Sequence, residues 1–392
     1  MKGRALIDAA ALVAAGALLV AGCGSSTAPT ASVRTSGSEP AAVRDPVDTT
    51  CSGKIAVMAP YTAGGSTDSV QMNWARVALD TFNVENGTGF QVEPVDVMDD
   101  VAAGVRGARR MIAEPAVVGV VGPQTSVVTA AVGPLFDRAK MAYVSPSATR
   151  TDLTDGRLKG FYRVVANDSV QGPTIASFTA GTLGARSVVI VQNPEPYSRG
   201  LADAVDAALA REGVRATRIT VPLRRSDYAA TIRRIPKDVD AVVMPFLLTE
   251  DGQRFVRQME QAGRDPRLVG GDALFVPTEF TKVGAYVSSY SPDLRKTPYG
   301  ASIIRLYESI FGDFSTFGGP AYTAMQVVAT AALQTCRAGR ASRAGVWRAM
   351  PAVELDDTLL GQRVAFGKDH ELQGGRFYMY RVEPNGGYSA MG

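Results

Sequence analysis

Histidine and cysteine, which most enzymes and metal sites require, are scarce in this chain. The 392 residues contain one histidine, His370, and three cysteines. One histidine excludes a two-histidine zinc helix and leaves a single candidate for every histidine-dependent mechanism. His370 lies in the turn-like segment FGKDHELQGG, where we expect a surface histidine. The chain also lacks the nucleophile-elbow, P-loop and dinucleotide-binding motifs. We therefore expect a protein that is not an enzyme and has no metal site and no cofactor.

Two segments place polar residues where the charged groups of a small ligand could bind. The segment 117–126 (VVGVVGPQTS) predicts a strand, a tight turn and a helix that starts near Ser126. A helix start offers unpaired N–H groups and a partial positive charge, which suit a carboxylate, although Ser126 could simply cap its helix. Asp272 follows a predicted strand in RLVGGDALF, at the strand end where α/β sheets bind ligands; it could instead cap the next turn.

The first 23 residues have the layout of an export signal. A basic start with Lys2 and Arg4 precedes an apolar run from Ala9 to Ala21, which is shorter than the about 20 residues that span a membrane. The next residues end in Gly22-Cys23, and residues 20–23 resemble the lipobox of bacterial lipoproteins, whose cysteine becomes the lipidated first residue of the mature chain. We predict a signal peptide over 1–22 and lipidation of Cys23. The alternative is a plain secretory signal with an incidental cysteine.

Residues 23–50 are rich in Ser, Thr, Pro, Ala and Gly and have scarcely any large apolar side chain, so we predict a flexible tether. Cys51 and Cys336 remain once Cys23 is lipidated, and disulfides persist outside the cytoplasm. We predict a disulfide between them, with two buried free thiols as the alternative. Acidic and basic residues nearly balance, at a net charge of +3, which argues against a nucleic-acid partner.

The elements that would position the polar residues follow a repeated order of strand and helix. Chains longer than about 250–300 residues usually divide their core, so two lobes are expected. We predict two successive α/β sheets of about five strands each, with helices on both faces. A first helix is expected from Ser66 to about Glu85, and a long late helix from Pro320 to Cys336. The predicted strands are 54–59, 90–97, 117–121, 142–145, 161–165, 187–192, 215–222, 240–246, 267–271, about 362–367 and about 376–383.

Eight segments in this order resemble the type I periplasmic binding proteins of the leucine/isoleucine/valine-binding kind, over residues 54–383. They are 54–65 (KIAVMAPYTAGG), 117–126, 141–154 (MAYVSPSATRTDLT), 161–172 (FYRVVANDSVQG), 195–205 (EPYSRGLADAV), 255–263 (FVRQMEQAG), 267–275 (RLVGGDALF) and 318–333 (GGPAYTAMQVVATAAL). The resemblance implies two Rossmann-like α/β lobes that are joined by three crossover segments, with a ligand cleft between them. Lobe one would comprise 54–164 and 274–365, and lobe two 165–273 and 366–392, with crossings near Val165, Ala273 and Phe366.

The resemblance also implies roles for single residues. In similar proteins, the serine at the position of Ser126 holds the α-carboxylate of an amino acid, and an acid at the position of Asp272 receives the ammonium group. Ser147 would contribute its backbone, and Thr149 its backbone and its hydroxyl; spacing alone does not distinguish their loop from an ordinary Ser/Thr-rich turn. Tyr197 matches a tyrosine that reaches the ligand from lobe two, with a solvent-facing tyrosine as the alternative.

Three further side chains are candidates for the cleft. Phe246 and Tyr61 could line a pocket for the ligand side chain, although aromatic residues at such positions more often belong to the core. Arg150 could lie at the cleft mouth and favour a second acid group, or could simply face water, as arginine more often does.

The function that the resemblance implies is that of an extracytoplasmic, lipid-anchored and monomeric substrate-binding protein. It would capture a small ligand, a branched-chain or related amino acid, by closure of its lobes and would deliver it to an ABC permease. The alternative is a lipid-tethered sensor of the same fold that reports to a membrane partner and has no transport role. The chain itself does not separate these two functions.

Overall fold

The computed structural model describes residues 50–60, 66–97, 100–314, 318–337 and 339–391. The predicted signal peptide, Cys23 and nearly all of the predicted tether lie outside these residues, as does Tyr61. Among the described residues, no helix has both the length and the apolar character that a membrane crossing requires.

Lobe one is built on a five-stranded parallel sheet with the strand order β2-β1-β3-β4-β5. The centre of this sheet consists of short apolar runs whose side chains are buried on both faces, as parallel sheets require. Its strands are β1 (Ser52–Ala59), β2 (Gly89–Asp96), β3 (Val117–Val121), β4 (Tyr143–Ser145) and β5 (Phe161–Arg163).

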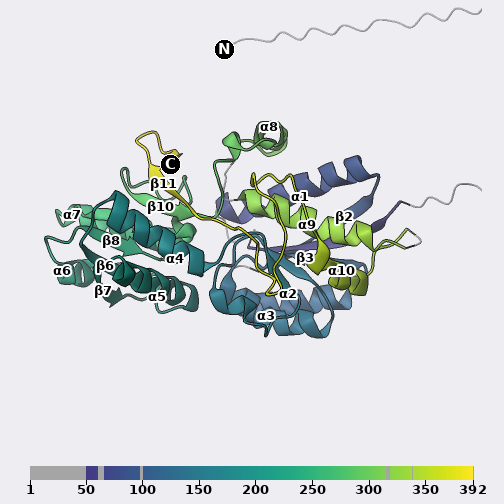
Figure 1. Ribbon diagram of the computed structural model, residues 1–392, viewed down its shortest axis with the longest axis horizontal. Helices are drawn as coiled ribbons and strands as arrows, with labels where there is room; N and C mark the ends of the chain where they lie inside the picture. Colours follow the sequence, from purple (N-terminus) through teal and green to yellow (C-terminus); the bar gives the residue numbers. More distant parts are fainter. Residues whose placement is uncertain (1–49, 61–65, 98–99, 315–317, 338, 392) are drawn as a thin grey trace, which may run out of the picture. The chain divides into compact units, whose positions relative to one another are not determined.

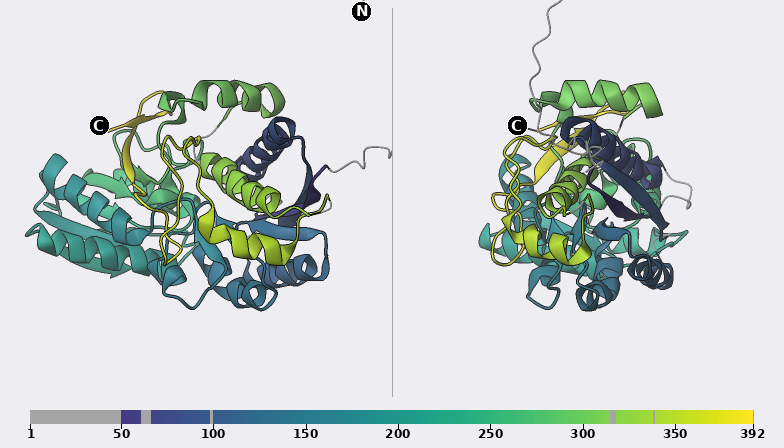
Figure 2. Two further views of the ribbon diagram at one scale, coloured as in Figure 1. Left: turned by 45° about the vertical axis from the view of Figure 1, so that its right-hand side comes forward. Right: turned by 90° about the vertical axis from the view of Figure 1, so that its right-hand side faces the viewer.

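Helices cover both faces of this sheet (Figure 1). One face packs against α1 (Ser66–Asn86), α9 (Gly319–Gln334) and α10 (Arg343–Ala349), and the other against α2 (Val101–Ala113) and α3 (Ser126–Arg138). A further helix, α8 (Gly300–Phe311), lies outside α1 (Figure 2), where the Tyr307 ring stacks on Trp74 with 4.4 Å between the ring centroids. The α1 and α9 helices match the predicted first and late helices closely.

Lobe two is built on a seven-stranded sheet with the order β12-β11-β10-β9-β8-β6-β7. The strands from β7 to β10 in this order are parallel to one another. At the other edge, β11 is antiparallel to β10, and β12 is antiparallel to β11. They are β6 (Ser187–Gln192), β7 (Arg215–Thr220), β8 (Ala241–Met244), β9 (Arg267–Gly270), β10 (Tyr286–Ser289), β11 (Tyr378–Val382) and β12 (Tyr388–Ala390). One face packs against α4 (Asp168–Ser177), its extension η2 (Phe178–Thr182) and α5 (Pro196–Arg211), and the other against α6 (Ala229–Arg234) and α7 (Thr249–Gln261).

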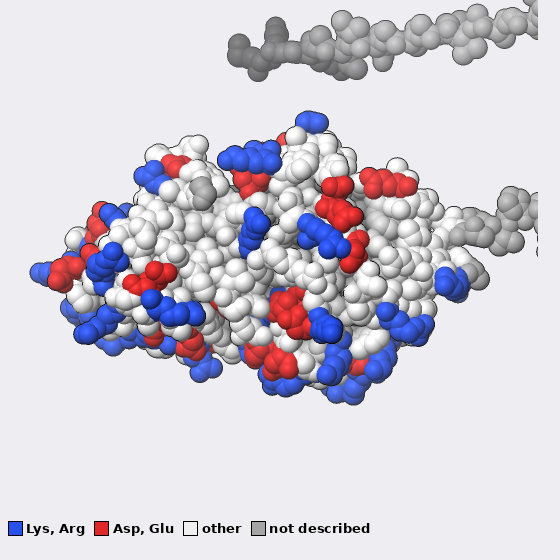
Figure 3. Space-filling model, in the orientation of Figure 1, with Lys and Arg blue, Asp and Glu red and all other residues white. Residues whose placement is uncertain are grey.

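Four short 3-10 helices complete the described elements: η1 (Thr151–Thr154), η3 (Asp272–Leu274), η4 (Leu294–Lys296) and η6 (Met350–Ala352). The segment predicted as a strand over 362–367 forms only isolated bridges, from Val364 to Leu355 and from Phe366 to Leu372. Acidic and basic side chains are intermixed over both lobes on the face in Figure 3.

The chain crosses between the lobes three times, and two of the crossings differ from the expected positions. The first falls between Val164, which packs in the core of lobe one, and Val165, which packs in that of lobe two. The second follows Tyr290 rather than Ala273, because β10 adds a strand to the sheet of lobe two before the chain leaves. The third lies between Leu372 and Phe377, since Phe366 and Leu372 still pack in lobe one. Of the described residues, lobe one therefore comprises those within 50–164 and 291–372, and lobe two those within 165–290 and 377–391.

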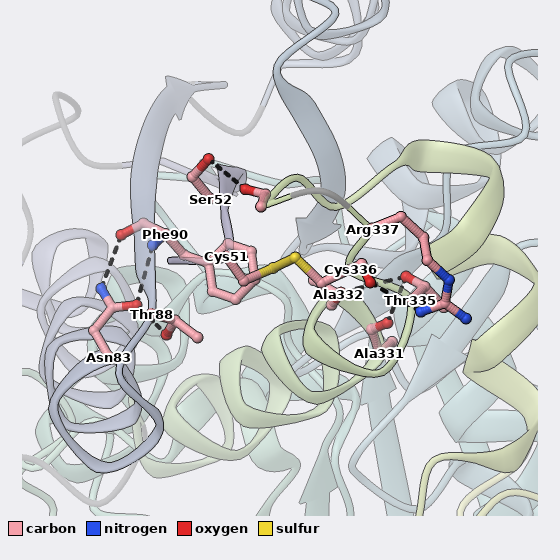
Figure 4. Close-up of a disulfide and its surroundings, with 11 residues drawn as sticks. Cys51, Ser52, Asn83, Thr88, Phe90, Ala331, Ala332, Thr335, Cys336 and Arg337 are labelled. Carbon is pink, nitrogen blue, oxygen red and sulfur yellow. Dashed lines mark hydrogen bonds between the residues drawn. A yellow bond between two sulfur atoms is a disulfide. The ribbon is translucent and has the colours of Figure 1, made fainter. Parts of the chain in front are cut away.

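The predicted disulfide between Cys51 and Cys336 is confirmed, with 6.0 Å between the two Cα atoms. It joins the residue before β1 to the segment after α9 (Figure 4). Ser52 reinforces the junction, because its N–H and its hydroxyl both donate to the Gly339 carbonyl and its own carbonyl accepts from the Ala341 N–H. Two chain segments that are 285 residues apart are thereby fixed side by side in lobe one.

Candidate ligand-binding site

The carboxyl ends of β3 and β4 in lobe one place Ser126 and the loop 145–150, named here the ligand loop, next to each other. Ser126 is the first residue of α3, and its Oγ accepts a hydrogen bond of 3.3 Å from the Arg150 N–H. The residue before it, Thr125, makes no side-chain capping bond. The N–H groups at the start of α3 therefore keep their preference for an anion. Ser126 does not cap its own helix, because its Oγ accepts from Arg150 of the ligand loop.

Ser145 and Ser147 fix the ligand loop to the turn before α3. Ser145 Oγ donates to the Pro123 carbonyl over 2.7 Å and accepts from the Ala148 N–H over 2.9 Å. Ser147 Oγ donates to the Gln124 carbonyl over 2.9 Å and accepts from Gln71 of α1 over 3.2 Å. These bonds hold the loop in one shape and leave Thr149 at its far end.

Thr149 connects the ligand loop of lobe one to the start of α4 in lobe two. Its carbonyl accepts a hydrogen bond of 2.9 Å from the Asp168 N–H. Among the described residues, neither the Thr149 hydroxyl nor either carboxylate oxygen of Asp168 has a hydrogen-bond partner of ordinary geometry, and all three atoms are buried. The nearby Thr149 side chain lowers the pKa of Asp168 but does not satisfy its carboxylate. A buried carboxylate without a well-formed hydrogen bond is costly, so this position is suited to a ligand that supplies donors.

Asp272, the first residue of η3, lies at the end of β9 and is bonded to two polar side chains. Its Oδ1 accepts hydrogen bonds of 2.7 Å from both the Tyr197 hydroxyl and the Gln171 amide. Glu195 caps α5, which begins with Pro196, and so sets Tyr197 in its first turn. Gly271 permits the approach, since a Cβ atom there would lie 2.9 Å from the Tyr197 hydroxyl.

The two acids are both buried, and the charge of Asp272 acts on Asp168. Burial, and then the charge of Asp272, raise the pKa of Asp168 to about 8, while Thr149 and two more distant arginines lower it in part. Burial also raises the pKa of Asp272, against the hydrogen bonds from Tyr197 and Gln171. Neither acid has a salt bridge within the described residues. A cationic ligand group would therefore be strongly favoured here.

The structure brings five of the predicted site residues together and separates one from them. The five residues lie where the ligand loop approaches α4 and α5; they are Ser126, Ser147, Thr149, Tyr197 and Asp272. Phe246 lies elsewhere: it is fully buried in lobe two, where its ring packs against those of Tyr228 and Phe255. Its burial in this aromatic cluster corrects the expectation that it faces the cleft.

Arg150 lines a groove between the lobes, about 340 Å³ in volume, whose other lining residues come from η1 and α5. Its guanidinium donates to Asp152 and so is already paired. Its charge is therefore largely satisfied within its own lobe, and the placement at a cleft mouth stays a prediction.

Two residues of the site, Asp168 and Tyr290, were not predicted from the sequence. The pKa of Tyr290 is raised well above its ordinary value, first by burial and then by the charge of Asp272. A hydrogen bond with Ser147 opposes this rise. Tyr290 thus lies between the ligand loop and Asp272. A signal for Asp168 was available, since Asn167-Asp168 follows a predicted strand and opens a helix. Tyr290 had no such signal, because β10 was not predicted.

His370 is half-buried, which corrects the expectation of a surface histidine. Its ring stacks on Tyr162 with 4.3 Å between centroids, and its Nδ1 atom lies 3.1 Å from the Phe161 carbonyl oxygen. Burial lowers its pKa. In the described part of the chain, no cluster of His, Cys, Asp and Glu could hold a metal ion.

Two α/β lobes with three crossovers, and a buried polar cluster to which both lobes contribute, define a two-lobe binding protein. The chain belongs to the periplasmic binding protein family, whose model matches residues 53–387. This family consists of binding proteins rather than enzymes. Its members lie outside the cytoplasm, and the Cys51–Cys336 disulfide is of the kind that persists there.

Similar proteins are known by sequence and by structure. The Leu/Ile/Val-binding protein BraC3 of Rhizobium johnstonii is 26% identical over 340 residues, which cover 84% of this chain and 91% of the relative. The leucine-binding protein LivK of Thermotoga maritima has a TM-score of 0.78 at 20% identity, over 87% of this chain and 98% of that one. The branched-chain amino acid transporter substrate-binding protein LivJ of Streptococcus pneumoniae, in complex with isoleucine, has a TM-score of 0.75 at 24% identity, with coverages of 87% and 98%.

Proposed function

We propose that this protein captures an amino acid and holds it by its ammonium and carboxylate groups. The observation that carries the proposal is the buried pair Asp168 and Asp272 of lobe two, whose Asp168 donates its N–H to the Thr149 carbonyl of the ligand loop in lobe one. The acids supply a counter-charge for an ammonium group. The helix start at Ser126, with the hydroxyl of Thr149, supplies donors for a carboxylate.

The two halves of this site come from different lobes. Ser126, Ser147 and Thr149 belong to lobe one, whereas Asp168, Tyr197 and Asp272 belong to lobe two. A zwitterion placed between them would bind its carboxylate to one lobe and its ammonium group to the other. Such a ligand favours the arrangement in which both lobes touch it, which is how a binding protein couples capture to lobe closure.

The relatives named for leucine, isoleucine and valine support a branched-chain or related amino acid as the ligand. Delivery to an ABC permease is the corresponding role, since the LivJ relative is a transporter substrate-binding protein. The lipobox-like residues 20–23 support a lipid anchor at Cys23, which would hold the protein at the outer face of the cell membrane as a monomer on a tether.

The test is thermal unfolding of the protein against a panel of amino acids, short carboxylates, amines and sugars. A ligand at about 1,000 times its Kd adds roughly 4 kcal/mol to stability, which moves the transition by several degrees. We expect leucine, isoleucine or valine to stabilise the protein, and the amine or acid analogues that lack one charged group to do so far less. Stabilisation by a sugar alone would contradict the proposal.

A further inference from the structure

The guanidinium of Arg163, at the end of β5, is completely satisfied although its side chain is buried. Its Nη1 donates to the carbonyls of Ala148 and Arg150, each over 2.8 Å. Its Nε donates to Glu371 over 2.8 Å, and its Nη2 donates to Thr154 over 3.0 Å and to Glu371. All five donors of an arginine are thus used. The two carbonyls belong to the residues on either side of Thr149, so Arg163 fixes the backbone from which this site residue projects.

Glu371 lies one residue before Leu372, just ahead of the third crossing, where the chain leaves lobe one for lobe two. Its carboxylate accepts hydrogen bonds from Arg163 and Thr154 of lobe one, and also from the Asn167 side chain of lobe two over 2.8 Å. Burial raises the pKa of Glu371, but the hydrogen bonds and charge of Arg163 outweigh it and the net pKa is lowered. The carboxylate is therefore ionised, and it joins the third crossing to the first.

Asn167 is at once a partner of Glu371 and the cap of α4. Its Oδ1 accepts from the Ser169 N–H over 2.8 Å, while its Nδ2 donates to Glu371. The residue that follows is Asp168, one of the two acids of the site. A single connected network therefore contacts the ligand loop, the first and third crossings and the helix start that carries Asp168.

We propose that Arg163 and Glu371 are positioning residues that couple the shape of the ligand loop to the angle between the lobes. The inference rests on the proposed function for its effect on ligand affinity, but its effect on the lobes does not depend on a ligand. When the lobes rotate about the first and third crossings, Asn167 moves relative to Glu371. Any shift of Glu371 is passed to Arg163, which holds the carbonyls on both sides of Thr149. An ion pair between a fully buried arginine and a partly exposed glutamate is well suited to this, because loss of Glu371 leaves the buried charge of Arg163 uncompensated.

Two variants break the network at different places. Glu371→Gln keeps the side-chain size but puts an amide group opposite the donors of Arg163, Thr154 and Asn167. Asn167→Ser keeps a good helix cap for α4 but is too short to reach Glu371. The matched control is Glu354→Gln, which breaks the exposed ion pair with Arg363 earlier in the same late segment.

The experiment measures the distance between the lobes by double electron–electron resonance on the full chain. Spin labels are placed at Arg109→Cys in α2 and Arg233→Cys in α6, both exposed, in a Cys23→Ser background that removes the cysteine outside the disulfide pair. In the ligand-free protein we expect a narrow distance distribution for the parent and for Glu354→Gln, and a broadened one for Glu371→Gln and Asn167→Ser. With L-leucine as the probe, the two network variants should bind about 5- to 150-fold more weakly, the usual range for coupled sites.

A purely structural role would lower the melting temperature and leave the ligand-free distance distribution unchanged. Wild-type distributions in both network variants, when these are folded, would overturn the proposal. If Glu371→Gln does not fold, Asn167→Ser alone decides the outcome. If the parent does not bind L-leucine or any other amino acid, the proposed function fails, but the distance measurement still tests the role of Arg163 and Glu371.

Discussion

Tyr197 donates a hydrogen bond of 2.7 Å to Oδ1 of Asp272, and both side chains are buried in lobe two. The same oxygen accepts from Gln171, which also donates to Ser288 of β10 over 2.8 Å. Three elements of lobe two, α4, α5 and η3, therefore meet at one carboxylate, and β10 supports Gln171 through Ser288. This carboxylate is oriented by the fold itself, so a ligand would not have to order it, which lowers the cost of binding.

Asp272→Asn tests whether this carboxylate binds the ammonium group of the ligand. We expect binding of the amino acid found in the unfolding screen to weaken by about 2–5 kcal/mol, because a buried ligand cation would lose a counter-charge. The fold should be retained, since burial already raises the pKa of Asp272 and a neutral amide fits the same space. Isothermal titration calorimetry gives the affinity. Asp265→Asn, an exposed acid of the same lobe, is the control. Equal affinity in Asp272→Asn and the parent would place the ammonium group elsewhere.

Most strands could be predicted from the sequence because a parallel strand that is buried on both faces is a continuous apolar run. Such runs occur in β3 and β6. In contrast, β10 is the short polar segment YVSS, and β12 is only three residues long. The residue pattern of neither segment distinguishes it from that of a loop. The missed β10 is also why the second crossing was placed near Ala273, since its pairing with β9 is a long-range contact.

The site could be predicted in part for a related reason. Ser126 and Asp272 follow strands that the pattern reveals, so their place at the carboxyl end of a sheet follows from the strand itself. The isolation of Phe246 in an aromatic cluster depends on Tyr228 and Phe255, which come from two other segments. The network of Arg163 and Glu371 joins residues 208 positions apart. Only the folded chain brings such partners together.

The disulfide should contribute substantially to the stability of lobe one. It closes a loop of 285 residues, for which the chain-entropy estimate is about 5–6 kcal/mol, an upper value because measured effects are usually smaller. We expect the double variant Cys51→Ala with Cys336→Ala to lower the midpoint of denaturant unfolding and to bind its ligand with unchanged affinity, because the bridge lies outside the site. Reduction of the parent should lower the midpoint by a similar amount. A midpoint that is the same in the variant and the oxidised parent would contradict the stabilising role.

The lipid anchor predicted at Cys23 can be tested in cells. Cys23→Ser removes the only thiol outside the disulfide pair, so we expect the protein to move from the membrane fraction to the soluble extracytoplasmic fraction. Metabolic labelling with a fatty acid should mark the parent and not the variant. The double cysteine variant without the disulfide is the control, because it keeps Cys23 and should stay with the membrane. Retention of Cys23→Ser at the membrane would contradict the lipoprotein assignment.

Asp168 should make both stability and binding depend on pH. Its pKa is raised to about 8 in the folded protein, first by burial and then by the charge of Asp272, whereas an unfolded aspartate titrates near 3.9. Between these values the folded state holds more protons than the unfolded state. The free energy of unfolding therefore falls as pH rises from about 4 to 8. We expect the melting temperature of the ligand-free parent to fall over this range, and Asp168→Asn to reduce that fall.

The same carboxylate would release a proton when a cationic ligand binds, because the ligand charge lowers its pKa. Calorimetry near pH 7 in two buffers with different ionisation enthalpies measures this release. We expect up to one proton per ligand in the parent and close to none in Asp168→Asn. Asp251→Asn is the matched control, because burial also raises the pKa of Asp251, which lies away from the site and bonds to the Arg224 N–H. That variant should alter the pH dependence of stability but release as many protons on binding as the parent does. Equal proton release by Asp168→Asn and the parent would show that Asp168 does not meet the ligand cation.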